Sequence, residues 1–80
     1  MHMAEVQKDY TLRSILQNAV KSGERLRFYG PGMMIVAEGT VAFVGKEVVA
    51  IKHSSNEEPD EFINLSCIIK IQVLGEYRPY

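Results

Sequence analysis

The sequence is poor in the residues that cross-link or anchor small proteins. Cys67 is its single cysteine, so no disulfide can form within one chain. We expect this thiol to be buried, because a free cysteine packs as a small hydrophobe. No apolar run approaches the roughly 18 residues of a membrane span, and no apolar signal segment opens the chain. These absences predict a cytoplasmic protein that does not enter a membrane.

An excess of either charge is also missing. Nine Lys and Arg stand against ten Asp and Glu, which gives a formal net charge of -1. This balance does not predict a nucleic-acid partner, although it is compatible with a local basic patch. The content of 46% hydrophobic and 24% charged residues is typical of one globular domain. A domain this small buries only about 60% of its unfolded surface, so we expect it to gain stability by oligomerising.

The usual arrangements of catalytic and metal-binding residues are absent. No nucleophile and orienting group accompany His53 in a recognisable pattern, and His53 with Cys67 supplies too few ligands for a metal site. The segment "GPG" at 30–32 lacks the lysine and the glycine spacing of a phosphate-binding loop. Four acidic residues of one loop lack the ligand order of a calcium site: Glu57, Glu58, Asp60 and Glu61. We therefore predict no enzyme, no metal and no cofactor.

One amphipathic helix is predicted near the start of the chain, at about residues 9–22. Its apolar residues follow the i, i+3, i+4, i+7 spacing of a buried stripe: Leu12, Ile15, Leu16 and Ala19. Asp9 or Thr11 is a suitable N-cap, and Gly23 is a suitable C-terminal stop. Arg13 lies on the opposite face, which we expect to be solvated.

Beyond residue 24 the hydrophobic pattern alternates with a period of two, which is typical of β-strands. Segments 24–30, 33–44, 47–53 and 62–74 are the predicted strands, the last of them being one bent strand or two short ones. In segment 33–44 the alternation predicts one inward face: Met33, Ile35, Ala37, Gly39, Val41 and Phe43. A mid-strand glycine marks a bend, a bulge or a close backbone approach, and we interpret Gly39 as the bend of a small barrel.

This arrangement resembles the Sm-like family, which includes the bacterial Hfq proteins. The resemblance covers roughly residues 9–74 and is carried by "LRSILQNAVKSGERLRFYG", "GTVAFVGKEVVAIK" and "FINLSCIIKIQVL". It implies one domain over 1–80, mainly β with one N-terminal helix: a helix at about 9–22, a strongly bent five-stranded antiparallel barrel at about 25–74, and irregular ends. It also implies assembly of identical copies into a ring through edge strands, and binding of single-stranded RNA.

Several positions depart from the family pattern. Gly45 stands where the family usually has an aspartate, and Val48 and Val49 stand where Sm proteins place a base-reading asparagine. Leu65 and Ser66 replace the lysine and histidine that line the uridine pore of Hfq. We therefore expect the pore-side RNA site to be absent or rebuilt.

Two sets of side chains remain as candidate sites. The RNA-binding candidates are Tyr29, Arg27 and Lys46, with Tyr29 matching a tyrosine that stacks on adenine in Hfq-type proteins. The candidates for an oligomer edge are the outward apolar residues Phe62, Ile68 and Leu74.

Three functions are compatible with these residues. The first is a ring that binds single-stranded RNA, and the second is a self-assembling scaffold or a protein-binding barrel that does not bind RNA. The third is an enzyme, which would need an interfacial site containing His53 or Cys67.

Overall fold

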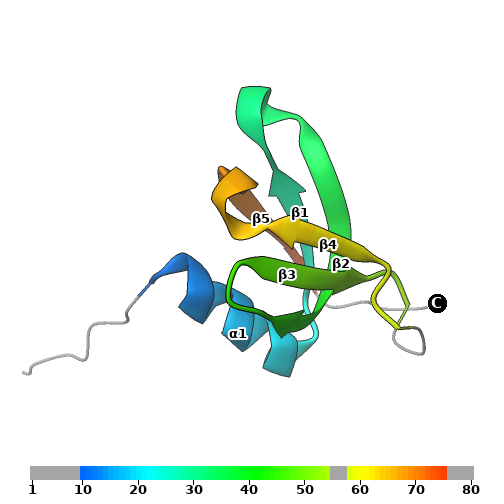
Figure 1. Ribbon diagram of the computed structural model, residues 1–80. Helices are drawn as coiled ribbons and strands as arrows, with labels where there is room; N and C mark the ends of the chain where they lie inside the picture. Colours follow the sequence, from blue (N-terminus) through cyan, green and yellow to red (C-terminus); the bar gives the residue numbers. More distant parts are fainter. Residues whose placement is uncertain (1–9, 55–57, 76–80) are drawn as a thin grey trace, which may run out of the picture.

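A computed structural model describes residues 10–54 and 58–75 of the chain. One helix precedes five strands, and two short 3-10 turns interrupt them (Figure 1). The elements are α1 (Leu12–Ser22), β1 (Arg25–Tyr29), η1 (Pro31–Met33), β2 (Ile35–Val44), β3 (Val48–Lys52), β4 (Glu61–Asn64), η2 (Leu65–Cys67) and β5 (Lys70–Gly75). The predicted segment 62–74 is thus two short strands separated by η2.

Both ends of α1 are closed by local hydrogen bonds. Thr11 accepts a bond from the Ser14 backbone N–H, and the Ser14 side chain binds the Thr11 backbone in return, which forms a capping box. Gly23 has a left-handed φ of 73° and donates its N–H to the Ala19 carbonyl oxygen. The predicted caps Thr11 and Gly23 are confirmed, whereas Asp9 lies outside the described residues.

The five strands form one antiparallel sheet in the order β4–β3–β2–β1–β5. The prediction of a mainly β fold with one helix and five antiparallel strands is confirmed. The closed barrel is not formed, because β4 and β5 lie at opposite ends of the strand order and do not pair. Each of them therefore has one edge that no described strand covers.

Strand β2 changes partner at Gly39. Its first half pairs with β1, up to the Leu26–Gly39 pair, and its second half pairs with β3 from the Thr40–Lys52 pair onward. A Cβ atom at Gly39 would lie 2.5 Å from the Lys52 carbonyl oxygen and 2.9 Å from Ile51 Cγ2. The prediction that this glycine permits a bend with close backbone approach agrees with this packing.

Two β-bulges in β2 overturn part of the predicted inward face. The pairing with β1 skips Val36, and the pairing with β3 skips Ala42. Each extra residue reverses the alternation beyond it, so Ile35 and Phe43 are exposed where the pattern predicted burial. Met33 is exposed as well, since it lies in η1 beyond the sheet. Only the three central residues Ala37, Gly39 and Val41 face inward as predicted.

The core lies between α1 and the concave side of the bent sheet. It is formed by Leu16 and Ala19 of the helix with six strand residues: Leu26, Phe28, Ala37, Val41, Val49 and Ile51. Phe28 is the largest of these side chains and is completely buried. All of the described side-chain polar atoms that are buried have a hydrogen-bond partner.

Candidate functional site

The outer face of β5, β1 and β2 carries two cross-strand rows of side chains. The strand register places Lys70, Tyr29 and Ile35 in one row. The same register places Gln72, Arg27 and Glu38 in the next row. Two of the three RNA-binding candidates, Arg27 and Tyr29, thus lie on one face of β1.

Glu38 is held between two arginines on this face. Its carboxylate accepts hydrogen bonds from Arg27 Nε at 2.9 Å and from Arg25 Nη2 at 3.0 Å. The bond from Arg27, followed by that from Arg25, lowers the pKa of Glu38 below its usual value. The same bond to Glu38, with a contribution from the Tyr29 side chain, raises the pKa of Arg27. Glu38 therefore offsets part of the positive charge that would attract a phosphate.

Tyr29 has its ring and its hydroxyl engaged by β5. Lys70 Nζ lies 4.7 Å from the ring centroid, which is a cation–π distance. The Tyr29 hydroxyl donates a hydrogen bond of 2.8 Å to Gln72 Oε1. Sequence reasoning missed Lys70 and Gln72 as neighbours of Tyr29, because their position depends on a pairing between residues more than 40 positions apart.

Lys46 lies in another part of the molecule, in the turn between β2 and β3. Arg13 of α1 donates hydrogen bonds to the carbonyl oxygens of Gly45 (2.9 Å) and Lys46 (3.0 Å). The predicted solvated Arg13 is indeed exposed, but its guanidinium also fixes this turn against the helix. No contact among the described residues joins Lys46 to Arg27 or Tyr29.

The edge strand β4 carries an exposed aromatic side chain. Phe62 is 58% exposed, and its ring centroid lies 6.3 Å from that of Phe43, which the Ala42 bulge turns outward. Phe62 pairs with Ala50 of β3, and Ala50 is completely buried. Exposed apolar side chains thus lie beside the open edge of β4. Phe62 points outward there, as the sequence predicted.

The opposite edge, β5, is also apolar. Leu74 is a bulged residue in the pairing with β1 and is partly exposed, and Val73 and Ile69 are more exposed still. Ile68, the third predicted edge residue, precedes β5 and packs against the core, so that it is only partly accessible. An apolar hollow of about 330 Å³ separates β5 from α1, and Leu12, Ile15 and Ile71 contribute to its walls.

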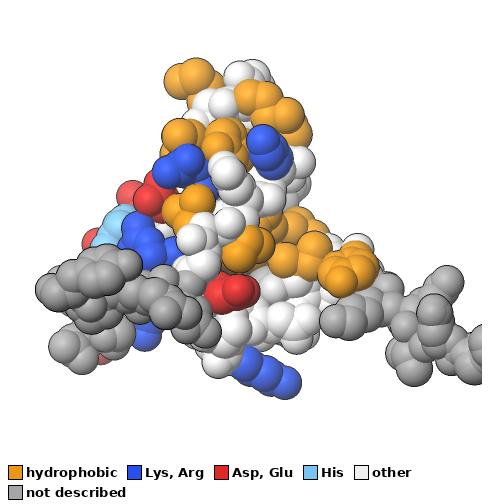
Figure 2. All heavy atoms as spheres, turned by 180° about the vertical axis from the view of Figure 1, so that it is seen from behind, with side chains coloured by type: hydrophobic (Ala, Val, Ile, Leu, Met, Phe, Trp, Pro, Cys, Tyr) orange, Lys and Arg blue, Asp and Glu red, His pale blue; other side chains and the backbone are white. Residues whose placement is uncertain are grey.

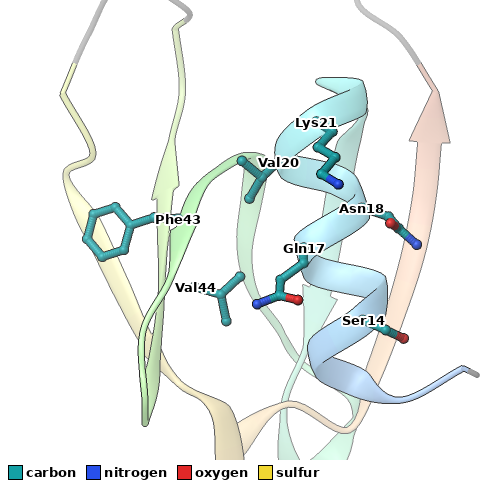
Figure 3. A pocket seen from close by; sticks show the side chains of 7 residues that line it. All are labelled: Ser14, Gln17, Asn18, Val20, Lys21, Phe43 and Val44. Carbon is teal, nitrogen blue, oxygen red and sulfur yellow. The ribbon is translucent and has the colours of Figure 1, made fainter.

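A second hollow lies between α1 and β2 (Figure 3). Its volume is about 360 Å³, and its lining mixes polar helix side chains with apolar ones. Gln17 and Val20 extend from the helix toward Val44 of β2, while the Phe43 ring points away from them. The polar groups do not converge on one point, so this hollow has the character of a shallow surface depression.

The residues considered for catalysis do not form a site. Cys67 is exposed, contrary to the prediction of burial, because it lies in η2 where the chain leaves the sheet between β4 and β5. His53 is exposed, with Nδ1 at 3.1 Å from Asp60 Oδ1 and Nε2 at 3.7 Å from Glu61 Oε1. Glu57 of the predicted acidic loop lies outside the described residues.

Residues 10–54 and 58–75 contain neither a metal-binding cluster nor a membrane-spanning helix. No group of three or more His, Cys, Asp or Glu side chains among them is placed to hold a metal ion. No described helix has the length and apolar character needed to cross a membrane.

No family model matches the chain, and no curated protein matches it either.

Proposed function

We propose that this protein is a self-assembling β module of the Sm-like type, in which identical copies join edge to edge. The observation that carries the proposal is the pair of open, apolar edges at β4 and β5. An uncovered edge offers unpaired backbone N–H and C=O groups, and exposed apolar side chains beside it favour association. A junction between β4 of one copy and β5 of the next leaves a free edge at each end, so that assembly continues until a ring closes.

The small core supports the same proposal. Eight buried residues form the described core, and neither a disulfide nor a described metal site reinforces it. Burying Phe62 and Val73 in a junction removes apolar area from water and adds inter-strand hydrogen bonds.

Single-edge variants test the β4–β5 junction. We expect the unmodified protein to be an oligomer, and Phe62→Lys and Val73→Lys each to be a monomer, because lysine on an edge strand opposes pairing. A 1:1 mixture of the two variants should form a heterodimer, since one supplies an intact β5 edge and the other an intact β4 edge. Size-exclusion chromatography with light scattering measures each state. Val20→Lys, which changes an exposed apolar residue of α1, is the control and should leave the oligomer intact.

Two outcomes would contradict this function. A monomeric unmodified protein removes self-assembly altogether. An oligomer that either edge variant retains shows that the copies associate through another surface.

A second candidate function is binding of single-stranded RNA on the outer face of β5, β1 and β2. The supporting observation is that the Tyr29 ring lies against Lys70 and shares one face of β1 with Arg25 and Arg27, both of which bind Glu38. An aromatic ring beside cations is the combination that single-stranded nucleic acid uses for stacking and phosphate contact. A base can stack on Tyr29 only where Lys70 does not cover the ring.

Substitutions on this face separate RNA binding from assembly. We expect Tyr29→Ala to weaken binding of a mixed single-stranded RNA pool at low salt by roughly 1–3 kcal/mol, because a stacked base is lost. Glu38→Gln should strengthen binding, because it frees Arg25 and Arg27 from their shared carboxylate. Fluorescence anisotropy gives both values, and Tyr10→Ala serves as an exposed-tyrosine control. Absence of binding at low salt removes this candidate and leaves the assembly proposal standing.

A further inference from the structure

The first half of β2 has an open edge of its own. Residues 35–39 pair with β1 on one side, whereas the pairing with β3 begins only at Thr40. No described strand covers the other side of residues 35–38. This half of β2 belongs to the hairpin that projects from the body of the molecule at the top of Figure 1. Its backbone N–H and C=O groups on that side are therefore available to a further strand.

Four consecutive apolar side chains are exposed at the same place. Met33, Met34, Ile35 and Val36 are exposed to 57%, 66%, 56% and 43%. They lie at and just after the tip of the hairpin, and Figure 2 shows hydrophobic side chains gathered over this end of the molecule. The Val36 bulge brings Ile35 into this group by turning it out of the core face. The open edge and the apolar surface thus coincide.

Met33 adds backbone strain to this exposure. Its φ of 59° is the one positive value among the described residues other than glycine. Residues with a Cβ atom rarely adopt this backbone conformation. The neighbouring Gly32 has a φ of 74°, so two successive residues lie in the left-handed region. The Met33 N–H closes the turn by donating to the Gly30 carbonyl oxygen at 2.9 Å, while its side chain stays exposed. Strained backbone positions of this kind concentrate at functional sites.

We propose that residues 35–38 and the hairpin tip bind a short, extended, apolar segment of another protein as an added β-strand. Backbone hydrogen bonds to the free side of β2 would hold the segment, and alternate apolar side chains would pack on Met34, Ile35 and Val36. The site uses the β2 edge and not β4 or β5, so it is independent of the proposed self-assembly.

The chemistry of the site favours a peptide over a lipid surface. Insertion of the tip into a bilayer would bury the open β2 edge in hydrocarbon, where unpaired backbone N–H and C=O groups are strongly unfavourable. An added strand pairs those groups and covers the apolar side chains together. A second copy of this chain is a poorer occupant, since the proposed assembly joins copies through β4 and β5 and leaves the free side of residues 35–38 uncovered.

The probes are labelled peptides in which Val, Ile, Leu or Phe alternates with Thr, flanked by Lys for solubility. We expect at least one to bind the full chain in an anisotropy titration. Two methylated versions of that peptide are compared, one N-methylated at the odd residues and the other at the even residues. One version should bind about tenfold or more weakly and the other should bind like the parent peptide, because only one set of N–H groups faces β2. Ile35→Lys and Met34→Lys should each weaken binding to a similar extent, whereas Val73→Lys, at the β5 edge, should not change it.

Specific outcomes would overturn the peptide site. One such outcome is that none of the alternating peptides binds. Another is that the two methylated versions lose affinity equally or retain it equally, since this indicates non-specific adhesion. Binding to phosphatidylcholine vesicles that Met34→Lys abolishes would identify a lipid partner in place of a peptide. Thermal unfolding of the variants verifies that they are folded, which is expected because both substituted residues are exposed.

Discussion

Gly39→Ala is expected to destabilise the domain by about 2–4 kcal/mol, since the added methyl group overfills a closed space. The new Cβ would lie 2.5 Å from the Lys52 carbonyl oxygen, which belongs to the paired backbone of β3 and cannot rotate away. Relief requires β2 and β3 to separate at the residue where β2 changes partner. A domain of this size has a total stability of roughly 4–12 kcal/mol, so this loss is a large fraction of it.

Urea denaturation measures the effect, and Gly23→Ala is its matched control. Gly23 has a left-handed φ of 73°, but a methyl group added there would meet no atom within 4 Å, so its substitution should cost only about 1 kcal/mol. If Gly39→Ala costs no more than Gly23→Ala, close approach at the bend is not what requires a glycine. Gly39→Ser adds a further atom at the same point and should be at least as destabilising as Gly39→Ala.

Phe28→Ala is expected to cost about 3–5 kcal/mol, which brings the domain close to unfolding. Phe28 is completely buried and is the largest side chain of the core, so that truncation leaves a cavity under α1 and the bent sheet. The midpoint of urea denaturation should fall accordingly. If the alanine variant does not fold, Phe28→Leu keeps most of the volume and should lower stability by a smaller, measurable amount.

Phe43→Ala is the control for the core substitution. Phe43 is 48% exposed and contacts Phe62 on the outer face of the sheet, so its removal should cost less than about 1.5 kcal/mol. Equal losses for the two phenylalanines would contradict the assignment of the core to the side of the sheet that faces α1.

Local signals predicted much of this fold. The apolar spacing and the caps of α1 lie within 13 residues, and the β2–β3 hairpin is formed by neighbours in the chain. The bend at Gly39 follows from the place of a glycine in the middle of a strand. These features depend on interactions between residues close in sequence, and therefore they can be predicted from one sequence.

The features that were missed depend on register between strands. Val36 and Ala42 are residue types common in regular strands, so the sequence does not indicate a β-bulge at either position. These bulges turn Ile35 and Phe43 outward. The neighbours of Tyr29 on β5 likewise follow from the pairing of strands that lie more than 40 positions apart in the sequence. Alternation predicts which residues share a face only while the pairing stays regular.

The candidate sites were predicted only in part. Phe62 and Leu74 do lie on the two edge strands, but Lys46 is separated from the arginine and tyrosine with which it was grouped. The sequence indicated the bend at Gly39 but not the open edge of β2, because that edge depends on which strand pairs with each half of β2.

The position of β5 in the strand order has a kinetic consequence. Strands β1 to β4 follow one another as neighbours in both sequence and sheet, whereas β5 returns across the whole domain to pair Arg25 with Gly75. Closing such a long loop costs more entropy than forming the hairpins and slows folding. During synthesis, β1 therefore keeps an unpaired edge until β5 leaves the ribosome. The chain is most exposed to wrong pairing with other chains in that interval.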